Sequence, residues 1–224
     1  MGWPRRLILL RHGRAVVNEN SRDENAELDT PDVAFPLIDF GEAQCMLTSQ
    51  YVNNEYPDID VIMSSPHKRA RSSARIFFPN RRILQEPRLT EMRIGMWTMF
   101  TRAQIEAMMP REIARYEAEG LYHYKPFGGD SGPDVELRIH SLLATLRMDY
   151  DGAVVACVTH HQWLVLFQRV IDGISIKETE RRLRHGQFYN ASVTAYEPKI
   201  VDGRPWLAPT MVNHVPWKGR LSTD

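Results

Sequence analysis

The sequence predicts an α/β fold in which helices cover both faces of a mostly parallel sheet. Short apolar runs that suit buried strands alternate with longer segments of helical spacing along most of the chain. Polar and turn-forming residues separate these segments, as they do where surface loops connect strands and helices. The expected architecture is therefore a three-layer α/β/α sandwich, and 224 residues suffice for one such domain.

The composition argues against several functional classes. Lys plus Arg and Asp plus Glu both number 28, so no net charge favours nucleic acid or a membrane as a partner. The N-terminal apolar run of four residues is too short for a signal peptide or a membrane span. Cys45 lies in a predicted helix and Cys157 in a predicted buried strand, where reduced thiols pack as core residues. We expect a cytoplasmic protein, either a monomer or a homodimer.

The first strand carries the residues around which the chain is organised. Residues 7–10 are four consecutive apolar residues, which predict a short strand buried on both faces, and Arg11, His12 and Gly13 follow directly. In α/β sheets, ligands bind at the carboxyl ends of the strands. A neutral imidazole can act as a nucleophile, a guanidinium can bind two phosphoryl oxygens, and glycine lets the backbone approach an anion. The alternative is a strand end with a chance Arg-His pair.

The first half of the chain continues with a long polar segment and two further strand–helix pairs. Residues 14–38 are irregular in pattern and predict a long loop, a kind of segment that is often functional. Ala43, Leu47 and Tyr51 then follow at helical spacing. The elements expected here are a helix over residues 39–56, a strand over 61–64, a helix over 67–78 and a strand near 82–85.

Residues 87–130 interrupt the alternation of strands and helices. Thr101 and Gln104 have the spacing of a helix capping box, and Pro110 divides what would otherwise be one long helix. Gly128 and Gly129 close the segment. We expect a helical lid insertion at about 87–130 that covers the end of the sheet within a single domain spanning residues 1–224.

The second half returns to the alternating pattern. Ser131 is placed to cap a helix that runs to about residue 149 with one apolar face. Residues 153–158 are the clearest buried strand, and the sequence Thr159-His160-His161 follows it. The remaining elements expected are helices over 162–172 and 176–183 and strands near 192–197 and 209–212.

Three strand ends supply side chains suited to binding an anion. The second strand leads into a basic cluster that includes Arg69 and Arg71, at a loop-to-helix junction where free backbone N–H groups also attract anions. The strand at 153–158 leads to His160. Taken singly, these arginines suit a solvated helix face and this histidine suits a hydrogen-bonded loop. Their joint occurrence with Arg11 and His12 favours a phosphate site at one edge of the sheet.

These motifs resemble those of the histidine phosphatase superfamily, in its phosphoglycerate-mutase-like branch 1. The matches occur in the family's order and cover nearly the whole chain up to residue 197. The matching stretches are Leu10-Arg11-His12-Gly13 with Asn18, Ser64-Ser65-Pro66 with Arg69-Ala70-Arg71, Leu89-Thr90-Glu91 with Gly95 and Trp97, Gly128-Gly129-Asp130-Ser131, Val158-Thr159-His160 and Asn190-Ala191-Ser192-Val193.

The resemblance implies a phosphoglycerate-mutase-like fold and a phosphatase that needs neither cofactor nor metal. It makes His12 the nucleophile that forms phosphohistidine, and Arg11, Arg69 and His160 the groups that hold the phosphoryl oxygens. It also implies that Asn18 adds a neutral hydrogen bond to the same group. The neighbouring arginines are expected to lower the pKa of His12, because like charges disfavour the imidazolium.

The resemblance also implies that Glu91 is the general acid and base. This residue would protonate the leaving oxygen and then activate water, a double role that calls for a raised pKa. Four apolar residues close to it in the sequence are expected to provide such surroundings: Met92, Ile94, Met96 and Trp97. The alternative for Glu91 is a surface carboxylate.

Several positions depart from the family's common pattern. Arg14 stands where many relatives have an acidic residue, His161 stands where a glycine is common, and Ala15 and Met99 are further departures. Gly13, Arg14, Asn18 and His161 are candidate substrate-binding residues. Arg14 is either a solvated loop charge or the group that recognises a second anion on the substrate.

Three alternatives to a phosphatase are open. A phosphoglycerate mutase shares the catalytic residues, but mutases typically have Glu-Arg-His-Tyr-Gly where this chain has Glu91-Met92-Arg93-Ile94-Gly95. A non-catalytic binder of phosphorylated ligands is a second alternative. A metal-dependent hydrolase built on His12, His160 and His161 is the weakest, because neither the histidine spacing nor the carboxylates suit a metal. The expected substrate is a phosphorylated small molecule or a phosphopeptide.

Overall fold

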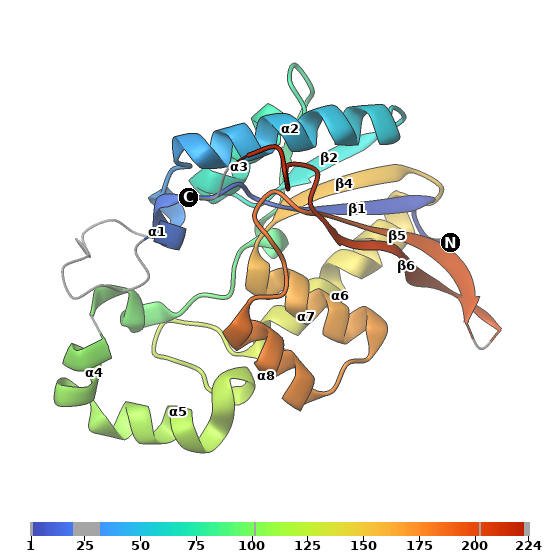
Figure 1. Ribbon diagram of the computed structural model, residues 1–224. Helices are drawn as coiled ribbons and strands as arrows, with labels where there is room; N and C mark the ends of the chain where they lie inside the picture. Colours follow the sequence, from blue (N-terminus) through green and yellow to red (C-terminus); the bar gives the residue numbers. More distant parts are fainter. Residues whose placement is uncertain (1, 20–31, 101, 202, 222–224) are drawn as a thin grey trace.

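The computed structural model describes residues 2–19, 32–100, 102–201 and 203–221, which contain one six-stranded sheet (Figure 1). The strand order is β3-β2-β4-β1-β5-β6. Pairs β3-β2, β2-β4 and β4-β1 are parallel, whereas β1-β5 and β5-β6 are antiparallel. The predicted mostly parallel sheet is confirmed, with an antiparallel hairpin at one edge. The strands are β1 (Arg6–Arg11), β2 (Val61–Ser64), β3 (Leu84–Gln85), β4 (Val154–Thr159), β5 (Val193–Val201) and β6 (Arg204–His214).

Helices pack on both faces of the sheet, so the predicted three-layer architecture is also confirmed (Figure 1). Helices α2 and α3 cover one face, and α6, α7 and α8 lie on the other. Besides the short α1, the described helices of these layers are α2 (Asp39–Glu55), α3 (Lys68–Phe77), α6 (Gly132–Asp149), α7 (His161–Asp172) and α8 (Ile176–His185). None of the helices in the described ranges is long and apolar enough to cross a membrane.

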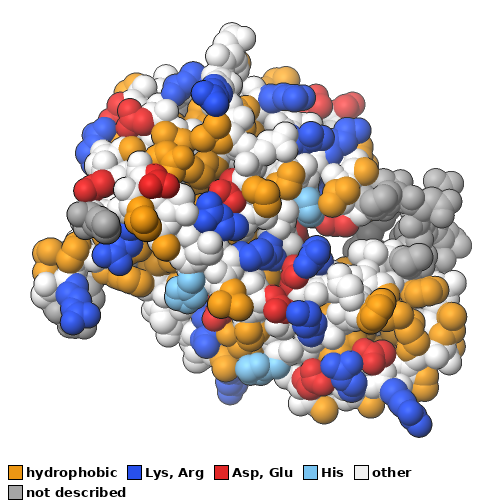
Figure 2. All heavy atoms as spheres, turned by 180° about the vertical axis from the view of Figure 1, so that it is seen from behind, with side chains coloured by type: hydrophobic (Ala, Val, Ile, Leu, Met, Phe, Trp, Pro, Cys, Tyr) orange, Lys and Arg blue, Asp and Glu red, His pale blue; other side chains and the backbone are white. Residues whose placement is uncertain are grey.

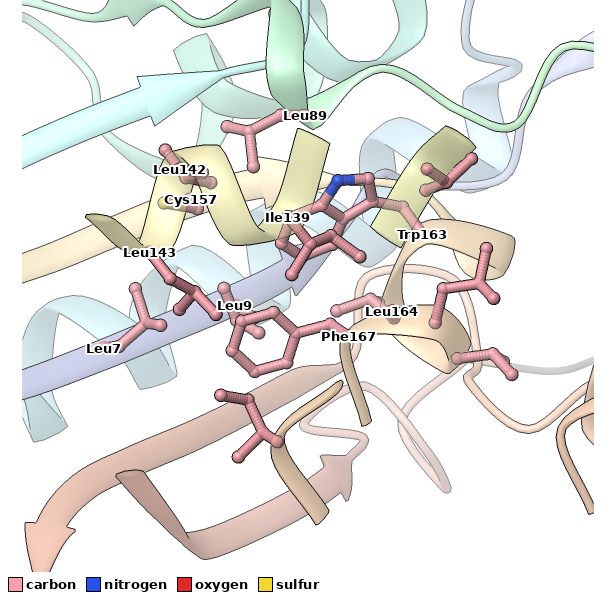
Figure 3. Close-up of a cluster of buried hydrophobic side chains, with 14 of the residues drawn as sticks. Leu7, Leu9, Leu89, Ile139, Leu142, Leu143, Cys157, Trp163, Leu164 and Phe167 are labelled. Atoms are coloured by element: carbon pink, nitrogen blue, oxygen red, sulfur yellow. The ribbon is translucent and has the colours of Figure 1, made fainter. Parts of the chain in front are cut away.

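Strand β1 is apolar throughout its centre because each of its faces meets a different core. Leu7 and Leu9 pack into the cluster formed with α6 and α7, whereas Ile8 and Leu10 pack into the cluster formed with α2 and α3. Alternate residues of a strand point to opposite faces, so burial on both sides requires a continuous apolar run. Figure 3 shows the first cluster, in which Leu7 lies near Leu143 and Leu9 lies near Phe167.

Residues 87–130 form a mainly helical segment that projects from the sandwich (Figure 1). Only Met109 separates helix α4 (Arg102–Met108) from α5 (Pro110–His123), which begins at the proline, so the predicted division at Pro110 is confirmed. The predicted cap at Thr101 lies outside the described residues. In the view from behind, hydrophobic side chains gather over the lobe that holds α4 and α5 (Figure 2).

Three regions of the chain differ from the sequence-based expectation: the segment 14–38, the strand near 82–85 and the two strands at the C-terminal end of the sheet. The segment 14–38, expected to be irregular, contains α1 (Val16–Glu19) and a 3₁₀ turn, η1 (Asp32–Ala34). Strand β3 is only two residues long. Strands β5 and β6 extend well beyond the predicted ranges as a hairpin. Much of β6 is exposed on at least one side, so its sequence lacks the apolar run that marks a buried strand.

Candidate active site

The ends of three parallel strands place the candidate residues at one edge of the sheet. In the strand register, Leu10 of β1 and Ser64 of β2 both pair with Val158 of β4, so the three strands end level with one another. The His12 backbone N–H donates to the Thr159 carbonyl at 3.1 Å, which continues this pairing beyond β1. As a result, the ring centroids of His12 and His160 are 5.1 Å apart.

His12 is buried, and a hydrogen bond fixes its orientation. Its side chain has 2% exposure, and Nδ1 lies 2.7 Å from the backbone carbonyl oxygen of Gly13. With Nδ1–H donating to this carbonyl, Nε2 keeps its lone pair, as a nucleophilic role would require. The pKa of His12 is well below its ordinary value of 6.5, mainly because of burial and then because of the charges of Arg69 and Arg11. The prediction that the neighbouring arginines lower the pKa of His12 is confirmed, although burial lowers this pKa more than the arginines do.

Gly13 is required by packing against α2. A Cβ at this position would lie 2.4 Å from the Gly41 carbonyl oxygen and 2.6 Å from Cys45 Sγ. The Gly13 backbone N–H donates to Ser73 Oγ at 3.0 Å. The glycine therefore lets the chain after His12 lie directly on α2, and its N–H is already paired with a protein group.

Around His12, several buried side-chain nitrogens have no hydrogen-bond partner among the described residues. They include Arg11 Nε, Arg69 Nε and His160 Nδ1, together with Nδ1 of the neighbouring His67. Other atoms of these side chains are anchored, since Arg11 Nη1 donates to the Phe188 carbonyl at 2.5 Å and His160 Nε2 lies 2.8 Å from Ser65 Oγ. With Nε2 accepting from the Ser65 hydroxyl, the proton of the neutral His160 ring is on Nδ1, which makes Nδ1 a donor. Buried polar atoms are nearly always hydrogen-bonded in folded proteins, so a group of unpaired donors marks a place for an acceptor. Their chemistry suits an anion with several oxygens.

The charge of these groups is consistent with an anion site. Burial lowers the pKa of Arg11 to about 10, which leaves it protonated at neutral pH. Burial, followed by the charge of Arg69, holds the pKa of His160 well below 6.5. At neutral pH the site therefore combines two guanidinium cations with neutral imidazoles, which can serve as nucleophile or hydrogen-bonding groups.

Glu91 is held by the N-terminal end of α7. Its Oε1 accepts hydrogen bonds from the backbone N–H groups of Met92 and Trp163, both at 3.1 Å, and Oε2 accepts from Gln162 N–H at 3.3 Å. Burial raises the pKa of Glu91, against the opposing effects of Arg69 and these amides, so the predicted direction is confirmed. Oε2, with a single long hydrogen bond, is the oxygen better placed to carry a proton.

An ion-pair network joins the segment after Glu91 to the start of α6. The buried Asp130 carboxylate accepts from Arg93 Nη2 at 2.7 Å and from Arg138 Nη2 at 3.0 Å. Gly95 has φ +55°, and a Cβ there would lie 2.2 Å from the Phe127 carbonyl oxygen. Together these contacts fix the backbone that carries Glu91, and the close approach of the Phe127 carbonyl gives a structural reason for the glycine at position 95.

The remaining candidate residues lie around this site with other partners. Asn18 Oδ1 accepts from the Ala15 N–H at 3.0 Å and lies 3.3 Å from Asn190 Nδ2. The Arg14 guanidinium carbon lies 5.9 Å from the centroid of the Phe40 ring. His161 is the first residue of α7, and burial followed by the charge of Arg11 lowers its pKa to about 3.

Two residues at the site were not singled out from the sequence. His67 is buried with its ring centroid 4.8 Å from that of His160, and its Nδ1 lies 3.4 Å from Asp32 Oδ2. Asp32 also pairs with Arg69. The position of His67 in the basic cluster after the second strand could have indicated that it belongs to the site. Nothing in the pattern of residues 14–38 distinguishes Asp32 from its neighbours. Among the described residues, no group of three or more His, Cys, Asp or Glu side chains is arranged to hold a metal ion.

Comparison with known proteins identifies the family. The sequence profile of the histidine phosphatase superfamily (branch 1) matches residues 7–205. The chain belongs to this superfamily. Glucosyl-3-phosphoglycerate phosphatase of Mycobacterium tuberculosis (strain ATCC 25618 / H37Rv) is 31% identical over 145 residues, which are 63% of this chain and 60% of that protein. Phosphoserine phosphatase 1 of Hydrogenobacter thermophilus is 30% identical over 158 residues, 69% of this chain and 70% of that protein.

Solved structures agree on the phosphoglycerate-mutase-like fold of the superfamily. The vanadate complex of mycobacterial glucosyl-3-phosphoglycerate phosphatase has a TM-score of 0.70 at 25% identity, covering 94% of this chain and 99% of that one. A putative alpha-ribazole-5'-P phosphatase from Escherichia coli has a TM-score of 0.74 at 19% identity, covering 95% and 98%. The aligned part of this chain spans about 60% of the length of the first mycobacterial relative.

The depressed pKa values of His12 and His160 predict that both rings are neutral at about pH 6, where an imidazole of ordinary pKa is mostly protonated. As the pH falls from 7 to 6, the nucleophile should therefore stay unprotonated. NMR of the ring nitrogens, assigned with His12→Asn and His160→Asn variants, measures this directly. Protonated rings at pH 6 would contradict the proposed electrostatics.

Proposed function

We propose that this chain is a cofactor-independent phosphatase that hydrolyses phosphomonoesters through phosphohistidine on His12. The observation that carries the proposal is the group of buried, unpaired donors of Arg11, Arg69 and His160 beside a neutral His12. These donors can hold the oxygens of a phosphoryl group, whose charge is spread over them in the transition state. Membership of the histidine phosphatase superfamily supports the same chemistry.

In the first step, His12 Nε2 attacks the phosphorus atom and the bond between phosphorus and the ester oxygen breaks. Protonated Glu91 gives its proton to the departing oxygen, so the alcohol leaves as a neutral molecule. The hydrogen bond between Nδ1 and the Gly13 carbonyl stabilises the positive charge that develops on the ring. Arg11, Arg69 and His160 hold the three non-bridging oxygens throughout.

In the second step, a water molecule attacks the phosphorus atom of phosphohistidine. The Glu91 carboxylate takes a proton from this water, the bond between Nε2 and phosphorus breaks, and inorganic phosphate leaves. His12 and protonated Glu91 are thereby regenerated. Burial of Glu91 suits it to both directions of proton transfer, because it brings the carboxyl pKa closer to neutrality.

A phosphorylated small molecule is the proposed substrate class. The names of two relatives, glucosyl-3-phosphoglycerate phosphatase and phosphoserine phosphatase, both describe phosphate esters of small molecules. Within this class, Arg14 and His161 are proposed to contact the non-transferred part of the substrate, with Gly13 and Asn18 shaping the site. Residues 87–130 are proposed to act as a lid within a single domain. Simple ligand binding is less well supported because the catalytic set is complete, and mutase chemistry is less well supported because Met92-Arg93-Ile94 follows Glu91. Phosphopeptides are less well supported because both of these relatives are named for small-molecule substrates.

The protein is proposed to work in the cytoplasm without nucleic acid or membrane partners, as a monomer or homodimer. The two cysteines support a reducing compartment, since Cys45 and Cys157 are both free thiols in the core. Burial raises the pKa of Cys45 to about 12, so this thiol is unreactive at neutral pH.

A phosphoenzyme trapped on His12 tests the proposed function. After brief reaction with a labelled phosphomonoester and an alkaline quench, the wild-type protein should carry acid-labile label and the His12→Ala variant should carry none. The exposed His140 provides a matched control, because His140→Ala should be labelled like the wild type. Label retained in His12→Ala would rule out His12 as the nucleophile.

The role of Glu91 predicts a dependence on the leaving group. In Glu91→Gln, the rate of enzyme phosphorylation should fall about a hundredfold or more for an alkyl phosphate, whose leaving oxygen needs a proton. An activated aryl phosphate should lose much less in this step, because a phenolate leaves without protonation. Rapid-quench measurement of the phosphorylation step separates it from hydrolysis. Equal losses for both substrates would indicate that Glu91 is not the acid.

A further inference from the structure

Asp32 forms a bidentate ion pair with the guanidinium of Arg69. Arg69 Nη1 donates to Asp32 Oδ1 at 3.0 Å, and Nη2 donates to Oδ2 at 3.2 Å. A third bond runs from Nη1 to the Asp32 backbone carbonyl at 2.6 Å. The Arg69 side chain is buried with 3% exposure, and that of Asp32 has 31%. The turn η1 is thus attached to α3 through one of the arginines proposed to hold the phosphoryl group.

The pair occupies the edge of the Arg69 guanidinium that is formed by Nη1 and Nη2, which we call the outer edge. It leaves available the edge formed by Nε and Nη2, which we call the Nε edge. A guanidinium has five N–H groups in a planar arrangement, and Asp32 accepts from three of them. The remaining two are Nε–H and the second hydrogen of Nη2, which lie side by side on the same edge. Nε is buried without a hydrogen-bond partner among the described residues. This edge has the geometry that binds two oxygens of a phosphoryl group.

Asp32 also faces a second group of the site. Its Oδ2 lies 3.4 Å from His67 Nδ1, and the His67 ring packs edge-on against His160 with centroids 4.8 Å apart. The carboxylate thus lies between the outer edge of Arg69 and a ring that supports His160. Burial, followed by the charge of Arg69, lowers the pKa of His67 to about 4, so Arg69 is the cation that Asp32 pairs with at neutral pH.

We propose that Asp32 is a positioning residue for catalysis, which holds the outer edge of Arg69 so that the Nε edge is presented to the phosphoryl group. The proposal rests on the proposed function, and it adds a residue of the loop before α2 to the machinery. An arginine side chain has several rotatable bonds, and fixing its guanidinium before substrate binds removes an entropic cost from binding and from the transition state. The carboxylate stays in place when the phosphoryl group binds, since the two anions use different edges.

The proposal is tested with Asp32→Ala, Asp32→Glu and the control Asp39→Ala, which removes an exposed carboxylate from the first turn of α2. With an aryl phosphate as substrate, Asp32→Ala should lower kcat/KM by about ten- to a hundredfold, in the range expected for a misplaced catalytic group. The inhibition constants for inorganic phosphate and orthovanadate should rise in parallel. Asp32→Glu should recover part of the loss, and Asp39→Ala should match the wild type.

A double-mutant cycle with Arg69→Ala shows whether Asp32 acts through Arg69. In the Arg69→Ala background, Asp32→Ala should cause no further loss of kcat/KM, because the group that it positions is absent. A full additional loss in that background would overturn the proposal. Tighter binding of phosphate by Asp32→Ala would also overturn it, since that result would make Asp32 a competitor for the anion site.

Two further measurements keep the outcome independent of folding and of the proposed function. Thermal unfolding identifies a variant with a disturbed fold, and Asp32→Asn, which keeps the side-chain size, then replaces Asp32→Ala. The amide keeps one acceptor oxygen but places an N–H donor where the second carboxylate oxygen accepts from Arg69, so it should break the bidentate pair and lower kcat/KM in the same direction. Failure to label His12 would refute the proposed function itself, whereas normal labelling with unchanged phosphate binding in the Asp32 variants would refute only the role of Asp32.

Discussion

The in-register pairing of three parallel strands is the constraint on which the site depends. Because Leu10, Val158 and Ser64 are aligned across β1, β4 and β2, the residues that follow each strand emerge at one edge. At the end of β4, His160 lies immediately before α7, and backbone N–H groups in the first turn of α7 donate to Glu91. One strand end thus positions both His160, which is proposed to bind the phosphoryl group, and the candidate acid. A shift of one residue in the register would separate these groups and would move each apolar side chain of β1 from its own core to the opposite one.

Burial of this site has an electrostatic cost that the fold offsets only in part. Asp32 neutralises Arg69, and the Phe188 carbonyl accepts from Arg11, but Nε of each guanidinium and Nδ1 of His160 have no hydrogen-bond partner in the part of the chain that the structure describes. An unsatisfied buried polar group costs on the order of 1–3 kcal/mol. A phosphoryl group would satisfy several of them at once. The surrounding core, with β1 covered on both faces, is what stabilises the protein enough to tolerate such a site.

Much of this arrangement could be predicted from the sequence because it depends on local patterns. The four apolar residues before Arg11 predict a strand buried on both faces, and the parallel topology then predicts where Arg11, His12 and His160 meet. Ser131 forms the predicted cap of α6, with Ser131 Oγ accepting from Asp134 N–H. Such features follow from residue spacing and from the general geometry of α/β folds.

Other features depend on contacts between distant parts of the chain. Asp32 meets Arg69 across 37 residues of sequence, and its own segment has no periodic pattern. Gly13 was expected to admit an anion, but the close approach of Gly41 determines its packing, and no sequence pattern predicts which helix lies there. The inward orientation of His67 depends on how the loop between β2 and α3 turns. The length of β6 was missed because an exposed antiparallel edge strand needs no apolar run.

The central claim is that His12 Nε2 and the unpaired donors of Arg11, Arg69 and His160 enclose one phosphoryl group. A crystal structure of the protein with orthovanadate tests it most directly, because vanadate adopts the geometry of the phosphoryl group in the transition state of its transfer. The account predicts vanadium bonded to His12 Nε2, with its oxygens contacting Arg11, the Nε edge of Arg69 and His160 Nδ1, and with Asp32 still paired to Arg69. Vanadate bound to another side chain, or held without contact to His12, would contradict it.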